Sequence, residues 1–163
     1  MSPKNNKVIK DLFEFKNICS EYQQANRKVV FTNGCFDIIH AGHVHLLNEA
    51  KKFGDILIVA VNSDSSIKKF KSQSRPINNT EDRVLVLSAM TVIDHIFIFD
   101  EETPENIINE IIPDVLVKGN DYEGKFIAGE KCMKENKKEV KLIKLLEGKS
   151  TTATINNIKT IED

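Results

Sequence analysis

Two histidines on either side of a glycine form the pattern in this sequence with the clearest chemical meaning. His40 and His43 end the stretch TNGCFDIIHAGH, residues 32–43, which follows a short apolar run. A helix that begins here would present free backbone N–H groups and a positive dipole, and both favour phosphate. Gly42 would let the backbone approach a phosphate closely. The two imidazoles could then donate hydrogen bonds to oxygens that gain charge as an α–β phosphate bond breaks.

The histidine pair also has structural interpretations. A histidine near a helix start is commonly a cap or a surface residue, and an H-x-x-H pair can belong to a zinc site. Zinc needs three or four ligands, but the three cysteines of the chain form no C-x-x-C pair. His45 and His95 have no evident place in such a set. We therefore expect no metal held by protein ligands and reduced, structural thiols at Cys19, Cys35 and Cys132.

The elements that must position the histidines alternate along the chain. Short apolar runs predict strands at 29–32, 56–61, 95–99, 115–118 and 140–143, and longer helical patterns predict helices at 9–24, 42–52, 80–89, 104–111, 128–135 and 150–159. For the helix at 104–111, Thr103 is expected at the N-cap and Pro104 at the first helical position. The strand patterns are continuously apolar, which suits strands covered on both faces. Strand then helix, repeated, predicts an α/β fold, a Rossmann-like open parallel sheet with helices on both faces.

Two polar segments are expected to form loops near a ligand. Residues 68–79 are rich in polar and basic side chains, and residues 118–125 contain the turn-forming Gly119, Asn120 and Gly124. Ligands of open parallel sheets bind beyond the carboxyl ends of the strands, so both loops could border such a crevice. We divide the chain into an N-terminal helical extension, 1–27, and one globular domain, 28–163.

Composition and charge exclude several classes of function. The 163 residues are 40% hydrophobic and 29% charged, with a formal net charge of -1, so we expect neither nucleic acid nor a membrane as partner. The apolar runs are too short to span a bilayer, and residues 1–10 lack the apolar core of a signal peptide. We therefore expect a cytoplasmic protein. The chain contains neither a P-loop nor a G-x-G-x-x-G motif, which disfavours P-loop kinases and dinucleotide dehydrogenases.

The segment around the histidines resembles the H-x-G-H signature of the nucleotidyltransferase superfamily, which includes the cytidylyltransferases. Other segments resemble, in order and spacing, one family within it, the D-glycero-β-D-manno-heptose 1-phosphate adenylyltransferases. These segments are TNGCFD (32–37), AVNSD (60–64), SRP (74–76), EDR (81–83), VKGNDY (117–122) and STT (150–152). That family occurs alone or as the C-terminal half of a bifunctional kinase–adenylyltransferase. The resemblance covers residues 28–158, and it departs from the family where Gly119-Asn120 replaces two glycines.

The resemblance implies a reaction and its partners. ATP and the sugar phosphate would give ADP-heptose and pyrophosphate, for lipopolysaccharide or another surface glycan. Mg²⁺ is expected because it bridges triphosphate oxygens. Related transferases are often dimers, so the resemblance also allows for a homodimer.

The resemblance also implies site residues in three groups. Catalytic roles fall to His40, His43, Lys71 and Arg83. Nucleotide-binding roles fall to Thr32, Asn33, Gly34, Phe36, Gly42, Lys118, Gly119, Asp121, Ser150, Thr151 and Thr152. Substrate-binding roles fall to Asp37, Asn62, Asp64 and Arg75. Arg75 and Arg83 are candidate phosphate clamps because a guanidinium offers paired donors, and Lys68 and Lys69 are alternatives to Lys71.

Other functions stay open on the sequence. A cytidylyltransferase acting on glycerol 3-phosphate, or on another small phosphorylated alcohol or sugar, is the nearest alternative. The glycerol 3-phosphate family carries an arginine where this chain reads AMTVID, residues 89–94. A non-catalytic module that binds ATP without turnover is a second alternative. RNA binding through residues 68–75 is less favoured because the chain has no evident basic face.

Overall fold

A single sheet of six parallel strands forms the centre of the molecule in the computed structural model, which describes residues 7–161. The strands are β1 (Val8–Ile9), β2 (Val29–Gly34), β3 (Ile56–Asn62), β4 (His95–Phe99), β5 (Val115–Gly119) and β6 (Glu139–Ile143). Their order across the sheet is β1-β4-β3-β2-β5-β6, and each neighbouring pair is parallel. The prediction of an open parallel sheet is thus confirmed.

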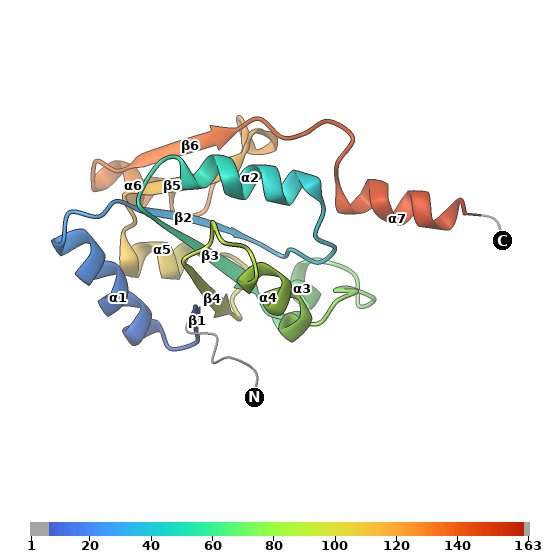
Figure 1. Cartoon of the computed structure of the whole chain (residues 1–163), viewed down its shortest axis with the longest axis horizontal. Coiled ribbons are helices and arrows are strands. Elements are labelled where there is room, and N and C mark those ends of the chain that lie inside the picture. The colour runs from blue at the N-terminus through green and yellow to red at the C-terminus, as the bar shows by residue number, and fades with distance from the viewer. Residues whose placement is uncertain (1–6, 162–163) are drawn as a thin grey trace.

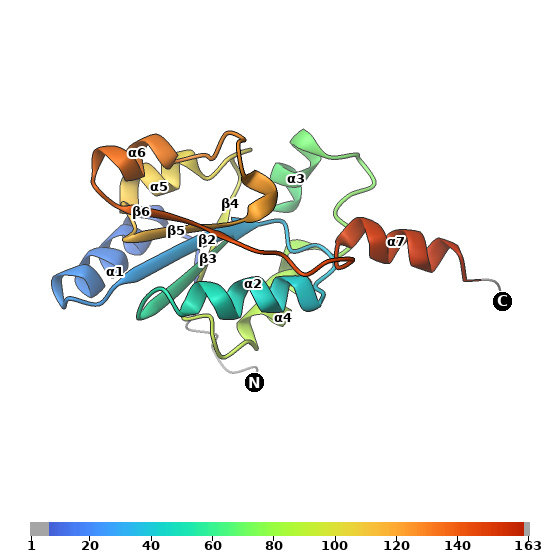
Figure 2. The same ribbon diagram turned by 90° about the horizontal axis from the view of Figure 1, so that it is seen from above.

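Seven α-helices surround or extend the sheet. They are α1 (Leu12–Gln24), α2 (Ala41–Lys51), α3 (Asp64–Phe70), α4 (Thr80–Ser88), α5 (Glu105–Ile111), α6 (Glu130–Glu135) and α7 (Thr151–Lys159). One apolar core joins the sheet to α1, α5 and α6, and a second core joins the other face to α2 and α4. Figure 2 shows α5 and α6 on one side of the strands and α2 and α4 on the opposite side. Helices therefore cover both faces, as the sequence predicts.

Strand β3 explains why the apolar runs are continuous. All seven of its residues are buried. Ile56, Ile58 and Ala60 belong to the first core, while Leu57, Val59 and Val61 belong to the second. A strand with helices on both faces has no solvent side, so no polar residue alternates with the apolar ones.

The N-terminal helix begins later than its pattern suggests. Residues Val8–Ile9 pair with Ile96 and Phe97 as strand β1, so the helix prediction for residue 9 is wrong. The carboxylate of Asp11 caps α1 by accepting a hydrogen bond from Glu14 N at 2.7 Å. Both β1 and α1 contribute to the first core; the division of the chain near residue 27 stays a prediction.

Two further boundaries differ from the sequence prediction. Thr103 does not cap α5; Pro104 is the N-cap, and no side chain makes a capping bond there. Residues 68–70, expected in a loop, belong to α3, which is capped by Ser63. The apolar pattern does not predict helix α3, because only two of its residues, Ser66 and Ile67, are buried.

Helix α7 stands away from the rest of the molecule (Figures 1 and 2). None of its residues is buried, and its capping residue is Ser150. Within residues 7–161 we find no helix with the length and apolar character needed to cross a membrane.

Candidate active site

The start of α2 lies against the segment that leads into α7. Gly42 is buried, and a Cβ atom on it would lie 3.1 Å from the backbone oxygen of Lys149 and 2.9 Å from His40 Cε1. A side chain at position 42 would require the His40 ring and the Lys149 backbone to move by a few tenths of an ångström. The fold therefore brings His40, His43 and the Ser150 cap to one place, although the two motifs are more than a hundred residues apart.

The histidine pair caps helix α2 in a reciprocal arrangement. His40 Nδ1 accepts a hydrogen bond from Gly42 N at 3.1 Å, and His43 Nδ1 accepts one from His40 N at 3.3 Å. A neutral imidazole has one donor and one acceptor nitrogen. Because both Nδ1 atoms accept, each neutral ring carries its proton on Nε2 and can donate it to a ligand. The ring centroids are 3.9 Å apart.

The surroundings keep both rings neutral. Burial, the charge of His40 and the charge of Lys71 lower the pKa of His43 from 6.5 to about 4. Burial and then the charge of Lys149 lower the pKa of His40. At neutral pH the pair therefore offers two uncharged N–H donors rather than two cations.

The first turn of α7 adds a second phosphate-binding feature. Ser150 is its N-cap, and its hydroxyl oxygen accepts a hydrogen bond from Ala153 N at 3.0 Å. The first backbone N–H groups of a helix have no intrahelical acceptor, so the Thr151 and Thr152 end of α7 favours an anion. Two helix starts thus flank the same place.

A cleft of about 390 Å³ lies at the carboxyl ends of β2, β3 and β5. Five of the predicted site residues line it: Asn33, Gly34, Asn62, Lys71 and Lys118. Its remaining wall comes from Cys35, Phe70, Glu102, Thr103, Pro104, Tyr122, Phe126 and Ala128. The lining does not include the histidines or the start of α7.

Lys118 is the buried charged residue of this cleft. It is 5% exposed, and its Nζ donates a hydrogen bond to Asn33 Oδ1. Nζ also lies 5.1 Å from the centroid of the Tyr122 ring. Burial lowers the pKa of Lys118 to about 8, and the charge of Asp121 opposes this shift.

Arg83 does not have the geometry of a phosphate clamp, so the clamp role expected for it is corrected. Its guanidinium is fully buried and donates to the backbone oxygens of Cys35, Asn62 and Asn78, to Asp64 Oδ1 and to Thr80 Oγ1. These contacts use all five N–H groups of an arginine side chain. Arg83 ties three separate stretches of the chain together and leaves no donor for a phosphate.

Asp37 and Asp64 are likewise occupied by protein partners, which argues against direct substrate contacts. Asp37 accepts hydrogen bonds from Arg75 Nε at 2.6 Å and from the backbone of Ile77 and Asn78. These bonds lower the pKa of the Asp37 carboxyl although its burial opposes the shift. The ion pair between Asp37 and Arg75 fixes the loop that follows α3. Arg75 Nη2 is buried and has no hydrogen-bond partner among the described residues.

Other predicted nucleotide contacts have supporting positions. The buried Thr32 hydroxyl donates to Val117 O at 3.0 Å and so joins β2 to β5; a contact between Thr32 and the nucleotide stays a prediction. Phe36 has a φ of +49° and packs its ring 5.3 Å from that of His43. A Cβ on Gly119 would lie 2.5 Å from Asp121 Oδ1, so a side chain at the end of β5 would displace that carboxylate.

The geometry favours Lys71 among the three lysines of its segment. Lys71 lines the cleft, and its charge lowers the pKa of His43. Lys69 instead donates to the backbone oxygen of Asp100 at 2.7 Å, and Lys68 is exposed and does not line the cleft.

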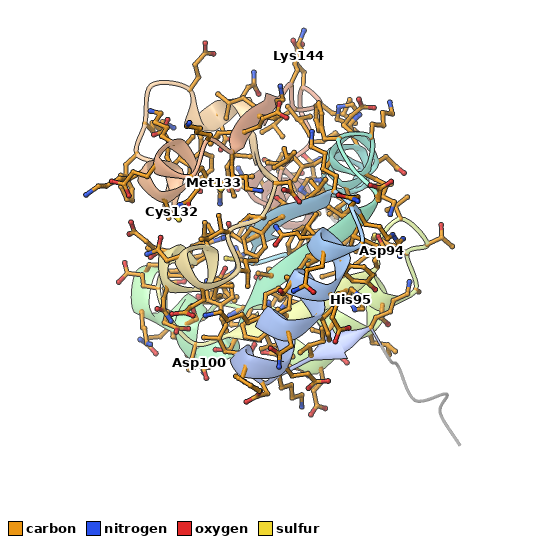
Figure 3. The ribbon with its side chains drawn as sticks, turned by 90° about the vertical axis from the view of Figure 1, so that its left-hand side faces the viewer. Asp94, His95, Asp100, Cys132, Met133 and Lys144 are labelled. Carbon is orange, nitrogen blue, oxygen red and sulfur yellow. The ribbon has the colours of Figure 1, made fainter. Side chains whose placement is uncertain are left out.

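His45 and His95 lie apart from the pair. The Tyr22 hydroxyl is 2.8 Å from His95 Nε2, and Figure 3 shows His95 beside helix α1, at the opposite end of β4 from Asp100. His45 Nε2 is 3.0 Å from the backbone oxygen of Lys144. Neither contact brings these rings to the cleft.

The residues of the cleft that our site prediction missed come mainly from two short segments. Glu102 and Thr103 follow β4, and Tyr122 and Phe126 follow β5. Their positions after parallel strands were a usable signal. Cys35, next to Gly34, was interpreted only as a structural thiol.

Comparison with known proteins gives consistent similarities. A family model described as cytidylyltransferase-like matches residues 31–161. The "Bifunctional protein HldE" of Wolinella succinogenes is 53% identical over 144 residues, which cover 88% of this chain and 30% of that protein. The protein of the same name from Campylobacter concisus is 52% identical over 151 residues, 93% of this chain and 31% of that protein. The chain thus spans about a third of the length of these relatives.

Two solved structures are similar as well. The lipopolysaccharide core biosynthesis protein from Thermoplasma volcanium GSS1 is 33% identical with a TM-score of 0.59, and the match covers 72% of this chain and 98% of that chain. The pantoate-beta-alanine ligase from Francisella tularensis shares the fold, with a TM-score of 0.63 at 14% identity, over 96% of this chain and 80% of that chain.

Proposed function

The chain belongs to the cytidylyltransferase-like family, and on this premise we propose that it transfers AMP from ATP to D-glycero-β-D-manno-heptose 1-phosphate. The products are ADP-heptose and pyrophosphate, for lipopolysaccharide or another surface glycan. The observation that carries the proposal is the close approach of Gly42 to the backbone of Lys149, which supports a shared site for two helix starts and two neutral imidazoles. The choice of ATP and heptose rests on the sequence motifs, and the HldE relatives support it because the chain matches about a third of a bifunctional protein.

The reaction needs no protein nucleophile. An oxygen of the acceptor's phosphate attacks the α-phosphorus of ATP, and a new O–P bond forms. The bond from the α-phosphorus to its bridging oxygen breaks, and its electron pair leaves with pyrophosphate. Because the acceptor is already an anion, the protein contributes in-line positioning and stabilisation of the charge that develops.

The proposed roles follow from the site geometry. His40 and His43 donate from Nε2 to the α-phosphate and to the departing pyrophosphate. The start of α7, at Ser150 and Thr151, holds the β- and γ-phosphates. Lys71 supplies a positive charge between the cleft and the histidines.

Magnesium is proposed as part of the ATP substrate. Within the described residues no group of three or more His, Cys, Asp or Glu side chains is arranged to hold a metal ion. Mg²⁺ needs few protein ligands when phosphate oxygens bind it, so it enters as MgATP. We also propose a homodimer, on the resemblance alone, and a cytoplasmic location, where ATP is available; light scattering during gel filtration tests the former.

A substrate panel tests the proposal. The purified chain is incubated with heptose 1-phosphate and each nucleoside triphosphate in turn, and with glycerol 3-phosphate and CTP, while pyrophosphate is measured. We expect pyrophosphate to be released only when ATP is combined with heptose 1-phosphate. Turnover with CTP only would replace the adenylyl assignment, and ATP binding without turnover on any acceptor would indicate a non-catalytic module.

A further inference from the structure

Lys118 is a buried ammonium group without a carboxylate partner. None of the ion pairs within 4.0 Å in residues 7–161 includes it. Its acceptor is the neutral amide oxygen of Asn33, and its other close neighbour is the face of the Tyr122 ring. An ammonium group has three N–H donors, and lysines are almost never fully buried without a partner. Lys118 therefore has no carboxylate at ion-pair distance, although the more distant charge of Asp121 also acts on it.

The position of Lys118 indicates where an anionic ligand could pair with its ammonium group. Its side chain lines the 390 Å³ cleft, together with Lys71 and Glu102. Two of the three charged residues that line the cleft are lysines, and the charge of Asp121 acts on one of them, Lys118, from outside the lining. The hydroxyl of Thr103, the amide of Asn62 and the aromatic Tyr122 supply the remaining polar and apolar contacts, a mixed lining suited to a hydroxylated small molecule.

The cleft and the histidine pair both adjoin the β2–α2 turn, and the histidines do not line the cleft. Gly34 and Cys35 line the cleft, and the chain then runs through Phe36 to the cap at His40. An in-line displacement needs the attacking and leaving oxygens on opposite sides of the α-phosphorus. If the triphosphate lies on the two helix starts, the acceptor must approach from another side, and the cleft provides that approach.

We infer that Lys118 is the counterion of the acceptor's phosphate monoester, so that the cleft selects phosphorylated over unphosphorylated sugars. This inference rests on the proposed function for the identity of the sugar, but not for the chemistry of the anion. Asn33 holds the ammonium group at the wall of the cleft, and Lys71 lies on the same cleft as a more exposed second cation. The triphosphate of ATP is assigned to the helix starts instead.

Calorimetric binding with single variants tests the inference. Lys118→Met keeps the length of the side chain and removes its charge. Affinity for heptose 1-phosphate, measured in the presence of a non-hydrolysable ATP analogue, should fall about 10- to 100-fold, as expected when a charged hydrogen bond is lost. Affinity for the ATP analogue alone should stay within about threefold of the parent value. Lys131→Met, on the exposed face of α6, is the matched control and should change neither.

A second variant tests the inference even if Lys118→Met does not fold. Asn33→Asp places a carboxylate beside Lys118 and gives the ammonium group an internal partner. The variant should fold at least as stably as the parent and bind inorganic phosphate and heptose 1-phosphate more weakly. Lys118→Arg should retain part of the affinity for the phosphate.

The outcomes separate the inference from the proposed function. If the chain turns over no heptose 1-phosphate but binds inorganic phosphate in a Lys118-dependent way, the proposed function fails and the inference stands. If Lys118→Met weakens the ATP analogue as much as the sugar phosphate, Lys118 serves the triphosphate and the inference is wrong. Unchanged sugar phosphate affinity in both Lys118→Met and Asn33→Asp would also overturn it.

Discussion

The two imidazoles at the start of α2 are held by backbone hydrogen bonds, and neither carries a charge at neutral pH; in the proposed function they would bind phosphate as neutral donors. The bonds from Gly42 N and His40 N occupy both Nδ1 atoms and direct both protons to Nε2. Burial and nearby cations oppose protonation. The pair therefore acts as a preorganised set of hydrogen-bond donors, and its contribution should appear in turnover rather than in substrate affinity.

Replacing either histidine tests this at the residue scale. His40→Ala or His43→Ala should lower kcat about 100- to 1000-fold, since each removes one donor to developing charge. Pyrophosphate release under saturating ATP and sugar phosphate gives the rate. His45→Ala, whose ring contacts only the Lys144 backbone oxygen, is the control. Near-parental rates in both catalytic variants would refute the assigned roles.

The depressed pKa of His43 predicts how stability depends on pH. An unfolded histidine takes up a proton near pH 6.5, whereas the folded His43 does so only near pH 4. Below pH 6.5 the unfolded state thus binds more protons, so the free energy of unfolding should fall as pH drops toward 4. Urea denaturation at pH 7 and pH 5 measures the difference. His43→Gln should show a smaller loss than the parent, and an equal loss would contradict the assignment.

Arg83 is expected to govern stability instead of phosphate binding. Arg83→Met would leave the backbone oxygens of Cys35, Asn62 and Asn78 without their buried donor. The expected decrease in the free energy of unfolding is about 3 kcal/mol or more. Denaturant titration measures it, with the exposed Arg27→Met as control at less than about 1 kcal/mol. A stable variant with weakened ATP binding would restore the clamp role.

The difference between His40 and Arg83 explains what the sequence can reveal about a site. His40, Gly42 and His43 are neighbours along the chain, so their spacing alone indicates a helix start with two donors. The partners of Arg83 come from separate segments, and only the fold brings them to one guanidinium. An arginine that binds phosphate and an arginine that binds three separate stretches of the chain have the same appearance in a sequence.

At the scale of elements, the distance between α2 and the segment before α7 depends on Gly42. Gly42→Ala would put a methyl group 3.1 Å from the Lys149 oxygen and 2.9 Å from His40 Cε1. The His40 ring and the Lys149 backbone must then shift by a few tenths of an ångström, so turnover should fall by roughly tenfold or less, below the effect of a 1 Å displacement. Steady-state kinetics with circular dichroism as a fold check measure this. Ala41→Ser, a change at the exposed residue before Gly42, is the control and should leave turnover unchanged.

The boundaries of an element can be predicted from the sequence where all its residues are buried. They are harder to predict where a capping side chain sets the end of a helix. Strand β3 is buried on both faces, so its apolar run is unambiguous. The start of α1 depends on the carboxylate of Asp11 rather than on periodicity, and Val8–Ile9 becomes a strand only because β4 offers a free edge. Such short strand pairings at a sheet edge depend on tertiary contacts, which local residue patterns do not predict.

At the scale of the molecule, α7 belongs to neither core, and the proposed function gives it a role only in the site. None of its residues is buried. A chain that ends at Lys149 should therefore keep its free energy of unfolding within about 1 kcal/mol of the parent. Its turnover should fall about 100-fold or more because the second helix start is lost. Denaturation and pyrophosphate assays measure both, and a chain that ends at Lys159 is the control. A large loss of stability would show that α7 belongs to the core.

The cleft is the part of the molecule that the sequence predicted least well. The parallel topology follows from the alternation of strands and helices, and it places polar residues at the carboxyl ends of the strands. The sequence does not show that Lys118 and Asn33 share a wall separate from the histidines. That separation depends on which way each side chain leaves the end of its strand.

The neutral state of the histidine pair has a consequence after the chemical step. A hydrogen bond from a charged donor is roughly twice as strong as one from a neutral donor. Uncharged imidazoles at the start of α2 therefore retain a departing polyanion less firmly than ammonium or guanidinium groups would. In the proposed reaction, the same neutral donors that assist bond cleavage would therefore also let pyrophosphate leave before the next nucleotide binds.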